Sequence, residues 1–509
     1  MAEPMTLRRA HAGIAALVRL RVTRNSAAML LSRAAMAAAA VVTLPLLYGR
    51  LGEHRFGVWI LLSGFVTILA LTDLGLSSML TREVARTAAD GGDRRLDALL
   101  GVGLAWGIGL GLVVLAVTAA CGPVAGRLFG LGAVGVEAWH AMLWLSAGVL
   151  AGGVELPWRA VLEGSQRFEA VAWIAGGSAV LGAGLAVAAV RSGGLVLLAA
   201  SSAATAVMRA AATVATARRY RPQWRPRPAL IRAADLRRAA GYGLPVQVSN
   251  AAALTNTEVD ALVLAGCFGP AMAGPFGVGT RLLNLLRLPP GLVLTALFPV
   301  AVEGAARHGP AWLDRFYVKA TAALAACIAP GAAALVVCAD PLVRLWLGHP
   351  MPWAAANLAI LAPSHALSLV AGAATVVTRA EGRPGRETRY VVLSAVLNVA
   401  LTAPLLWLAG PLGVSVATAV AVTASTAYFV GYFHRTTGRP FGAILRVTGR
   451  AVLAAAAAGA LVAAVAGDLP DGPGRAGAAA AVGSRGALVL AIAAALLFLA
   501  RDRRRELAP

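Results

Sequence analysis

The stretch ARRYRPQWRPRPALIRAADLRRAAGY, residues 217–242, divides an otherwise apolar chain of 509 residues into two halves. It is the longest hydrophilic stretch between apolar segments and contains eight arginines. Pro222, Pro226 and Pro228 interrupt its first part, which we therefore expect to be extended and not helical. Six apolar segments precede it, six follow it, and two more lie near the carboxyl end. We interpret the stretch as the linker between the two halves of a membrane protein.

The apolar segments are long enough to cross a bilayer, because a helix needs about 20 residues to span the ~30 Å hydrocarbon core. The composition agrees, since 59% of the residues are hydrophobic, 13% are charged and the mean hydropathy is +0.74. A soluble domain carries about 25% charged residues. The fourteen predicted spans are 27–49, 56–79, 98–120, 138–158, 169–190, 193–216, 243–264, 276–299, 318–339, 353–378, 389–408, 412–433, 451–466 and 485–500.

The loops between these spans alternate in charge. Counted from the basic amino terminus, most of the 45 Lys and Arg residues fall in every second loop, and the intervening loops are nearly bare. Short cytoplasmic loops retain basic residues. The pattern therefore predicts a multi-pass protein of the bacterial inner membrane with both termini in the cytoplasm. The net charge of +22 is dispersed among these loops, which favours anionic phospholipids as partners and argues against nucleic acid.

The spans group into five parts. Residues 1–26 resemble a basic amphipathic helix on the cytoplasmic surface. Residues 27–216 form a first lobe of six spans and 243–436 a second, on either side of the linker; 437–509 hold the last two spans and a basic cytoplasmic tail.

The two lobes look like distant copies of each other. Phe56-Gly57-Val58 begins the second span and Phe276-Gly277-Val278 begins the eighth. Both lobes start inside and contain an even number of spans, so they share one orientation. Parallel repeats of this kind are related by a two-fold axis along the membrane normal and hold their substrate near mid-membrane. We expect an all-α fold of two six-helix lobes around a central cavity, with two extra helices at the carboxyl end.

Enzymatic function has little support in the loops. A membrane glycosyltransferase or polymerase needs an acidic metal site or a general base on a sizeable loop. Asp90, Asp93 and Asp97 cluster in one loop, but they interleave with arginines, which indicates a solvated turn and a helix start. Cys121 and Cys267 leave a disulfide open, although the four cysteines are better explained as apolar filler. We predict a transporter without metal or cofactor, and a membrane-embedded polymerase or transferase is the weaker alternative.

Arginines inside the spans are the first candidates for substrate binding. An ionisable side chain at membrane depth costs at least ~2.5 kcal/mol, so such residues usually face a cavity and carry function. Arg281 and Arg287 lie in the eighth span with Asn284 between them, three residues from each, and Arg209 lies in the sixth. Guanidinium groups suit a diphosphate. Arg33 lies near the inner end of the first span, where it either joins this cavity or extends to the surface.

Acidic residues inside the spans are the second set of candidates. Glu258 and Asp260 are two residues apart, so on a helix their side chains point in nearly opposite directions. We expect one to line a cavity or bind a coupling ion and the other to pair with an arginine; Asp73, in the second span, is a further candidate. Glu155, beside Pro157, is interpreted as structural.

The stretch LYGRLGEHRFGVWILLSGFVTILALTDLGLSSMLTREVAR (47–86) resembles the first helical hairpin of bacterial O-antigen and polysaccharide flippases. These belong to the multidrug/oligosaccharidyl-lipid/polysaccharide (MOP) exporter superfamily. Further resemblances follow in the family's order over most of residues 25–435. They are PWRAVLEGSQRFE (157–169), Asp260, Phe276-Gly277-Val278, Arg281, Leu288-Pro289, Phe298-Pro299, PLVRLWLG (341–348) and VVLSAVLNVALTAPLLWLAGPLGVSVAT (391–418).

The resemblance implies a flippase with a fold like that of the MATE transporters of this superfamily. Its substrate would be an undecaprenyl-diphosphate-linked oligosaccharide, a repeat unit of O-antigen, capsule or exopolysaccharide. An ion gradient or the membrane potential would move it from the cytoplasmic to the periplasmic leaflet by alternating access. Partners would include a polysaccharide polymerase and glycosyltransferases. Asp73, Asp260 and Arg281 match motif positions of the family, but Phe276 stands where a Tyr is expected.

Two relatives within the superfamily compete with this reading. A lipid II flippase also has fourteen spans, but its arginine cluster in the first lobe is not evident, since Arg33 is the only arginine inside the first three predicted spans. A drug/cation antiporter has twelve spans and an acidic cavity without arginines.

Overall fold

A computed structural model describes residues 4–506 except 71–75, 88–93, 193, 228–250, 253, 384 and 440. All regular elements within this part of the chain are helical. The chain forms two compact units: the first comprises residues 1–55 and 65–248, and the second comprises 56–64 and 249–509. The all-α prediction is confirmed for the described residues. Asp73 and most of the linker's second part lie outside them.

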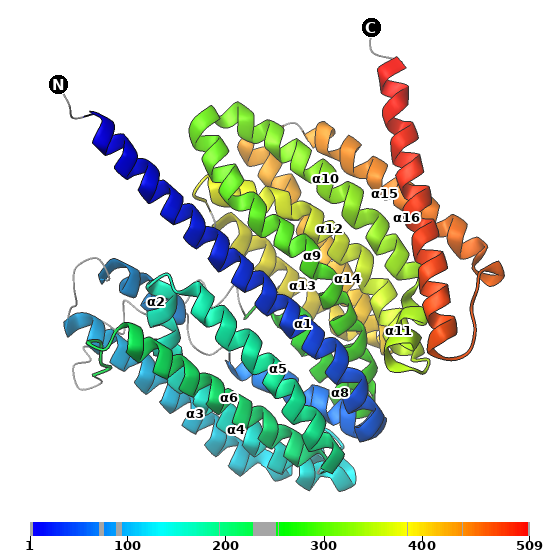
Figure 1. Cartoon of the computed structure of the whole chain (residues 1–509). Coiled ribbons are helices and arrows are strands. Elements are labelled where there is room, and N and C mark those ends of the chain that lie inside the picture. The colour runs from blue at the N-terminus through cyan, green and yellow to red at the C-terminus, as the bar shows by residue number, and fades with distance from the viewer. Residues whose placement is uncertain are drawn as a thin grey trace. The chain divides into compact units, whose positions relative to one another are not determined.

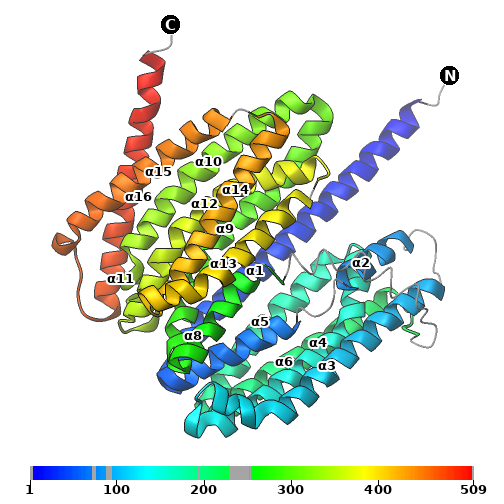
Figure 2. The same cartoon turned by 180° about the vertical axis from the view of Figure 1, so that it is seen from behind.

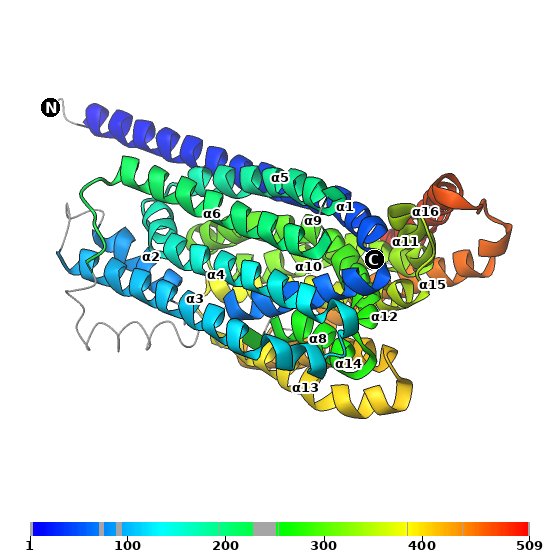
Figure 3. The same cartoon turned by 90° about the horizontal axis from the view of Figure 1, so that it is seen from below.

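The first unit is built around α4. Its helices are α1 (Pro4–Ala70), α2 (Leu76–Thr87), α3 (Arg94–Leu128), α4 (Gly135–Gly164), α5 (Phe168–Ser192) and α6 (Gly194–Tyr220). The α4 helix packs against both α3 and α6, and α5 packs against α6 (Figures 1 and 3). Glycines allow the α3–α4 approach, since a Cβ at Gly107 would lie 2.3 Å from the carbonyl oxygen of Gly153.

The α1 helix bends at Gly52, whose φ of 74° lies in the region that favours glycine. The bend separates the predicted spans 27–49 and 56–79, which share the single apolar segment Ala27–Leu69. Residues 56–64, after the bend, pack in the second unit. There Phe56 and Val58 are fully buried, and a Cβ at Gly57 would lie 1.9 Å from the carbonyl oxygen of Pro270. The predicted surface helix 1–26 is continuous with α1 from residue 4 onward.

The second unit is built around α12. Its helices are α8 (Asp260–Phe268), α9 (Pro270–His308), α10 (Pro310–Val337), α11 (Ala339–Leu347), α12 (Pro352–Ala380), α13 (Gly385–Ala409), α14 (Leu412–Thr437), α15 (Phe441–Ala464) and α16 (Gly474–Glu506). The α12 helix packs against α9, α10 and α14. Figure 2 shows α13 beside α14, while α15 and α16 pack on each other and on α10.

The described residues contain twelve helices that are long and apolar enough to cross a membrane. One of them holds the first two predicted spans, as noted above. The predicted span 243–264 falls partly on residues outside the described part, so it stays a prediction. The remaining predicted spans each overlap one candidate helix.

The first part of the linker is held to the first unit by Asp97. Residues 221–227 are not helical, as predicted. The backbone N–H of Arg225 donates to Oδ1 of Asp97 at 2.9 Å, the backbone N–H of Arg227 donates to the Asp97 carbonyl at 2.9 Å, and Trp224 is buried in the core of this unit. The expected helix start is confirmed, because Asp97 lies in the first turn of α3. The expected exposure to solvent is wrong for this residue, which is 8% exposed and anchors the linker. The lobe boundaries themselves stay predictions.

Candidate functional site

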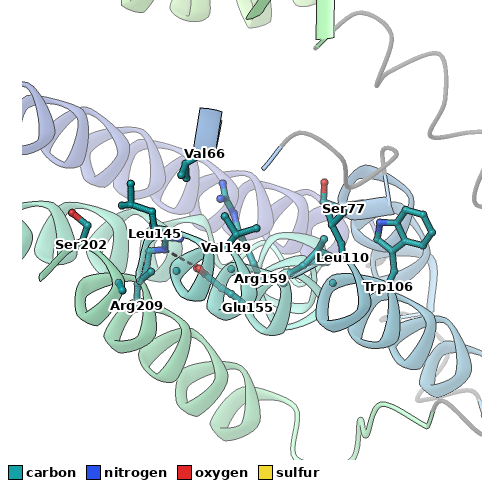
Figure 4. A pocket seen from close by; sticks show the side chains of 18 of the residues that line it. Val66, Ser77, Trp106, Leu110, Leu145, Val149, Glu155, Arg159, Ser202 and Arg209 are labelled. Carbon is teal, nitrogen blue, oxygen red and sulfur yellow. Dashed lines mark hydrogen bonds and ion pairs between the residues drawn. The ribbon is translucent and has the colours of Figure 1, made fainter. Parts of the chain in front are cut away.

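A pocket of about 520 Å³ lies within the first unit (Figure 4). The α4 helix contributes one face of its lining, from Leu145 to Glu163, with α3 and α6 on either side. Four ionisable side chains of transmembrane helices meet there: Glu155, Arg159 and Glu163 of α4, and Arg209 of α6. Each would be costly against lipid. The pocket therefore brings four charged groups together within an apolar unit.

Arg209 and Glu155 form an ion pair across this pocket. Nε of Arg209 donates to Oε2 of Glu155 at 2.8 Å. Thr213 Oγ1, one turn further along α6, donates to the other carboxylate oxygen at 3.0 Å. The Glu155 side chain is 8% exposed, whereas that of Arg209 is 40% exposed. Glu155, interpreted from sequence as structural, is thus the direct partner of a predicted site residue. This pairing could not be predicted from the sequence, because the two residues are 54 positions apart.

In the second unit, Arg281 lies close enough to Glu258 for the two charges to interact. Arg281 is on α9 and half-buried. Glu258 is on a π-helical turn, Thr255–Val259, which leads into α8. Such turns recur at functional sites. The carboxylate of Glu258 partly offsets the charge of Arg281.

Arg287 lies on the same α9 helix and contacts Asn284. Its Nη1 donates to Oδ1 of Asn284 at 3.2 Å. That acceptor is a neutral amide, so this bond leaves the guanidinium charge uncompensated. Arg287 also lies beside His365 of α12, and both line an otherwise apolar pocket of about 440 Å³. Arg281, Arg287 and Asn284 therefore share one helix, and each has a different local environment.

Asp260 is fully buried at the start of α8, in contrast to Glu258. Oγ1 of Thr418, on α14, donates a short hydrogen bond to Oδ2 of Asp260. Asn398 of α13 lies beside the same carboxyl group, and its Nδ2 donates to Oγ1 of Thr418 at 2.6 Å. Within the described residues, Oδ1 of Asp260 and Oδ1 of Asn398 are buried without a hydrogen-bond donor. Three helices thus meet at one buried acid. Its own Oδ1 and the Oδ1 of Asn398 are the two oxygens there that lack a donor within the described residues.

Neither Asn398 nor Thr418 was predicted as a site residue. Both lie in a stretch that carries the family resemblance, but neutral polar residues are common in membrane helices and give no signal by themselves. Asn357 of α12 was missed for the same reason. It is 1% exposed, donates to the carbonyl of Phe276 at 3.0 Å, and accepts from Ser415 at 2.7 Å, which ties α9, α12 and α14 together.

Two predicted site residues, Arg33 and Asp73, remain to be described. Arg33 is exposed on α1, and Asp73 lies outside the described residues. Among those residues, no group of three His, Cys, Asp or Glu side chains that could hold a metal ion is found. The four cysteines are free.

Comparison with known proteins identifies the family and the fold of this chain. The family described as polysaccharide biosynthesis protein matches residues 22–304, more than half of the chain. No curated protein sequence matches. A solved lipid II flippase MurJ, in an inward closed conformation, superposes with a TM-score of 0.70 at 14% identity, over 94% of this chain and 99% of that one.

Two further structures extend the comparison. An inward-facing multidrug resistance MATE family transporter of the MOP superfamily gives a TM-score of 0.65 at 14% identity, over 81% of this chain and 98% of that one. A MOP superfamily transporter from Pyrococcus furiosus, described as having a binding pocket of reverse polarity, gives 0.57 at 17% identity over 82% and 95%. At these identities the likeness shows the fold, and the predicted MATE-like fold is confirmed.

Proposed function

Because this chain belongs to the polysaccharide biosynthesis protein family and has the fold of the MOP superfamily transporters, we propose that it is a flippase for lipid-linked saccharides. The substrate is an undecaprenyl-diphosphate-linked oligosaccharide, the repeat unit of an O-antigen, capsule or exopolysaccharide. It moves from the cytoplasmic to the periplasmic leaflet of the inner membrane. The observation that carries the proposal is the pair Arg281 and Arg287 on the single helix α9, with Asn284 bonded to Arg287.

The two arginines suit the one group that all such substrates share, the diphosphate. Arginine forms two-pronged, charge-assisted bonds to phosphate oxygens. Arg287 is the stronger anion site, because its bond to Asn284 leaves its charge free to act on a ligand. Arg281 is partly offset by Glu258 and releases charge to the substrate if Glu258 takes up a proton. Arg33 stays a proposed member of this set, whereas Arg209, predicted from sequence as a further member, is bound to Glu155 in the first unit.

The buried acid Asp260 is the proposed coupling site. A carboxylate with one oxygen hydrogen-bonded and the other unsatisfied, in an apolar interior, favours a proton or a small cation as its partner. The second unsatisfied oxygen, Oδ1 of Asn398, supports a cation ligand at the same place. Because α8, α13 and α14 meet there, binding or loss of the ion changes how these helices pack. Asp73 stays a proposed further acid.

The experiment compares strains that lack the gene and carry single variants. Lipid extracts of the deletion strain should contain an accumulated undecaprenyl-diphosphate-linked saccharide, and the wild-type gene should clear it. Arg281→Ala and Arg287→Ala should each weaken diphosphate binding by about 1.5–3 kcal/mol, roughly tenfold to a hundredfold. Arg281→Lys should restore part of the activity, because it keeps the charge and loses the two-pronged geometry.

Arg307→Ala is the matched control, since Arg307 lies on the same helix, is exposed, and forms a local ion pair with Glu303 at 2.7 Å. It should behave as wild type at equal membrane abundance. Accumulated peptidoglycan precursor would instead indicate a lipid II flippase, and no accumulated lipid at all would favour a drug/cation antiporter. Full activity of both alanine variants would remove these arginines from the substrate site.

A further inference from the structure

We infer that the pocket of the first unit is the saccharide-binding subsite of this transporter, separate from the residues that hold the diphosphate. The inference rests on the proposed function and adds to it a place for the sugar. Each lining residue belongs to the first unit, and the pocket has a volume of about 520 Å³. Small-molecule sites range from about 300 to 1,000 Å³. The size therefore suits a short saccharide.

The pocket is elongated along α4. Its lining residues on this helix recur every three or four positions from Leu145 to Glu163, so they form one continuous face. Eighteen positions at 1.5 Å per residue give this face a length of about 27 Å. In Figure 4, Ser202 and Trp106 lie toward opposite ends, with Glu155 and Arg209 between them. The shape is a groove along which a chain of several rings can lie.

The charges of the pocket balance, which argues against a phosphate and for a neutral polar ligand. Arg209 pairs with Glu155 at 2.8 Å, and Arg159 pairs with Glu163 at 2.8 Å. A diphosphate would meet two carboxylates as well as two guanidinium groups. A sugar needs both kinds of group, because each hydroxyl can donate to a carboxylate and accept from a guanidinium.

The other lining groups fit the same ligand. Trp106 is 36% exposed and lines the pocket, and a flat aromatic ring offers an apolar surface to the C–H face of a sugar ring. Ser202 of α6 adds a hydroxyl group to the lining. Aromatic side chains with a few placed polar groups are the usual lining of ligand pockets.

The floor of the groove contains glycines, which keep it open. A Cβ at Gly152 would meet no atom within 4 Å, although Gly152 lines the pocket. A side chain at this position would therefore start into the groove without a clash at its Cβ. Gly177 of α5 is equally free of neighbours but does not line this pocket, so it provides a matched control.

The test measures binding of two lipids to the purified full-length protein in detergent by native mass spectrometry. One probe is the lipid-linked saccharide extracted from the deletion strain, and the other is undecaprenyl diphosphate without a sugar. Gly152→Leu should weaken binding of the first probe at least tenfold and leave the second unchanged. Glu155→Gln, which keeps the size of the side chain and removes its charge, should weaken the first probe severalfold. Gly177→Leu should bind both probes as wild type does.

The controls separate this inference from the function on which it rests. Arg287→Ala should weaken both probes, because the diphosphate is common to them. If Gly152→Leu and Glu155→Gln bind the saccharide probe normally, or lose both probes to the same degree, the pocket is not a saccharide subsite, whatever Arg287→Ala does. If the deletion strain accumulates no lipid-linked saccharide, the proposed function fails and this inference falls with it.

Discussion

Both carboxylate oxygens of Asp471 accept hydrogen bonds from Nη2 of Arg344, at 3.0 Å each. The contact ties the loop before α16 to α11. Arg485, on α16, donates to the same carboxylate at 2.9 Å. One acid outside the spans thus links α11, α16 and the loop that precedes α16.

This contact predicts how stability depends on pH. The hydrogen bond from Arg344 lowers the pKa of Asp471. A carboxyl group whose pKa falls on folding stabilises the folded state above its unfolded pKa, about 3.9, and this contribution is lost as the pH falls through the folded pKa. Asp471→Asn should therefore lower the free energy of unfolding by about 0.5–1 kcal/mol at pH 7, with no difference at the lowest pH. Thermal unfolding across pH 3–7 measures this, with Asp340→Asn, on the same arginine, as the comparison. A deficit that does not change with pH would contradict it.

Gly57 should tolerate no side chain. A Cβ there would lie 1.9 Å from the carbonyl oxygen of Pro270, so Gly57→Ala must push the two helices apart at a cost of about 1–3 kcal/mol. Gly49→Ala, on the same helix with nothing within 4 Å, should be neutral or stabilising by up to about 1 kcal/mol. Melting temperatures of the two purified variants decide, and equal values would show that the approach of the helices is looser than described.

Asp97 should hold the first part of the linker against α3. Asp97→Ala removes the acceptor for the N–H of Arg225, which should cost about 1.5–3 kcal/mol locally and raise the rate of chymotrypsin cleavage after the buried Trp224 about tenfold or more. Asp97→Asn keeps an acceptor oxygen, so its cleavage rate should stay near that of wild type. Equal cleavage of the alanine variant and wild type would leave the linker held by other contacts.

Asp260 should be required for coupling but not for folding. Asp260→Asn keeps an oxygen that accepts from Thr418 and removes the charge. The rate of gradient-driven transport by reconstituted protein with this change should fall at least tenfold, at unchanged protein abundance. Glu303→Gln removes an exposed acid on α9 and should retain the response. Gradient dependence that survives in Asp260→Asn would exclude this acid as the coupling site.

The predicted orientation is tested by reporter fusions. Fusions after Gly269 and Gly348 should report the periplasm, and fusions after Gly382 and Gly438 the cytoplasm, because arginine-rich loops stay inside. One inverted pair would break the alternation from that point onward.

The helices were predictable because hydropathy is a local property. The predicted span 353–378 lies within Pro352–Ala380, and 412–433 lies within Leu412–Thr437. Which helices pack against each other is not a local property of the sequence. The apolar pattern of residues 56–64 fits either unit, and their place in the second depends on Pro270, more than 200 positions later.

Candidate site residues could be proposed from sequence where a charge stands out in an apolar span. Arg281, Arg287 and Asp260 were proposed in this way, and their roles stay predictions. The hydrogen bond between Arg287 and Asn284 agrees with their spacing of three residues. Asn398 and Thr418 were not found, because their importance comes from burial beside Asp260 and not from their residue type. The ion pair between Glu155 and Arg209 could not be predicted, because it depends on how α4 and α6 pack against each other.

The glycine bend at Gly52 has a consequence for how the protein is made. The ribosome delivers residues 56–64 early, but the α9 helix, against which Phe56 and Gly57 pack, begins only at Pro270. At ~5–20 residues per second, this segment waits roughly 10–40 s inside the membrane without its final neighbour. Phe56 and Val58 are apolar and wait in lipid at little cost, and Gly57 leaves a notch in the helix surface. The late-arriving turn at Pro270 fits that notch, so the second half of the protein completes its assembly around a segment synthesised before the first half was finished.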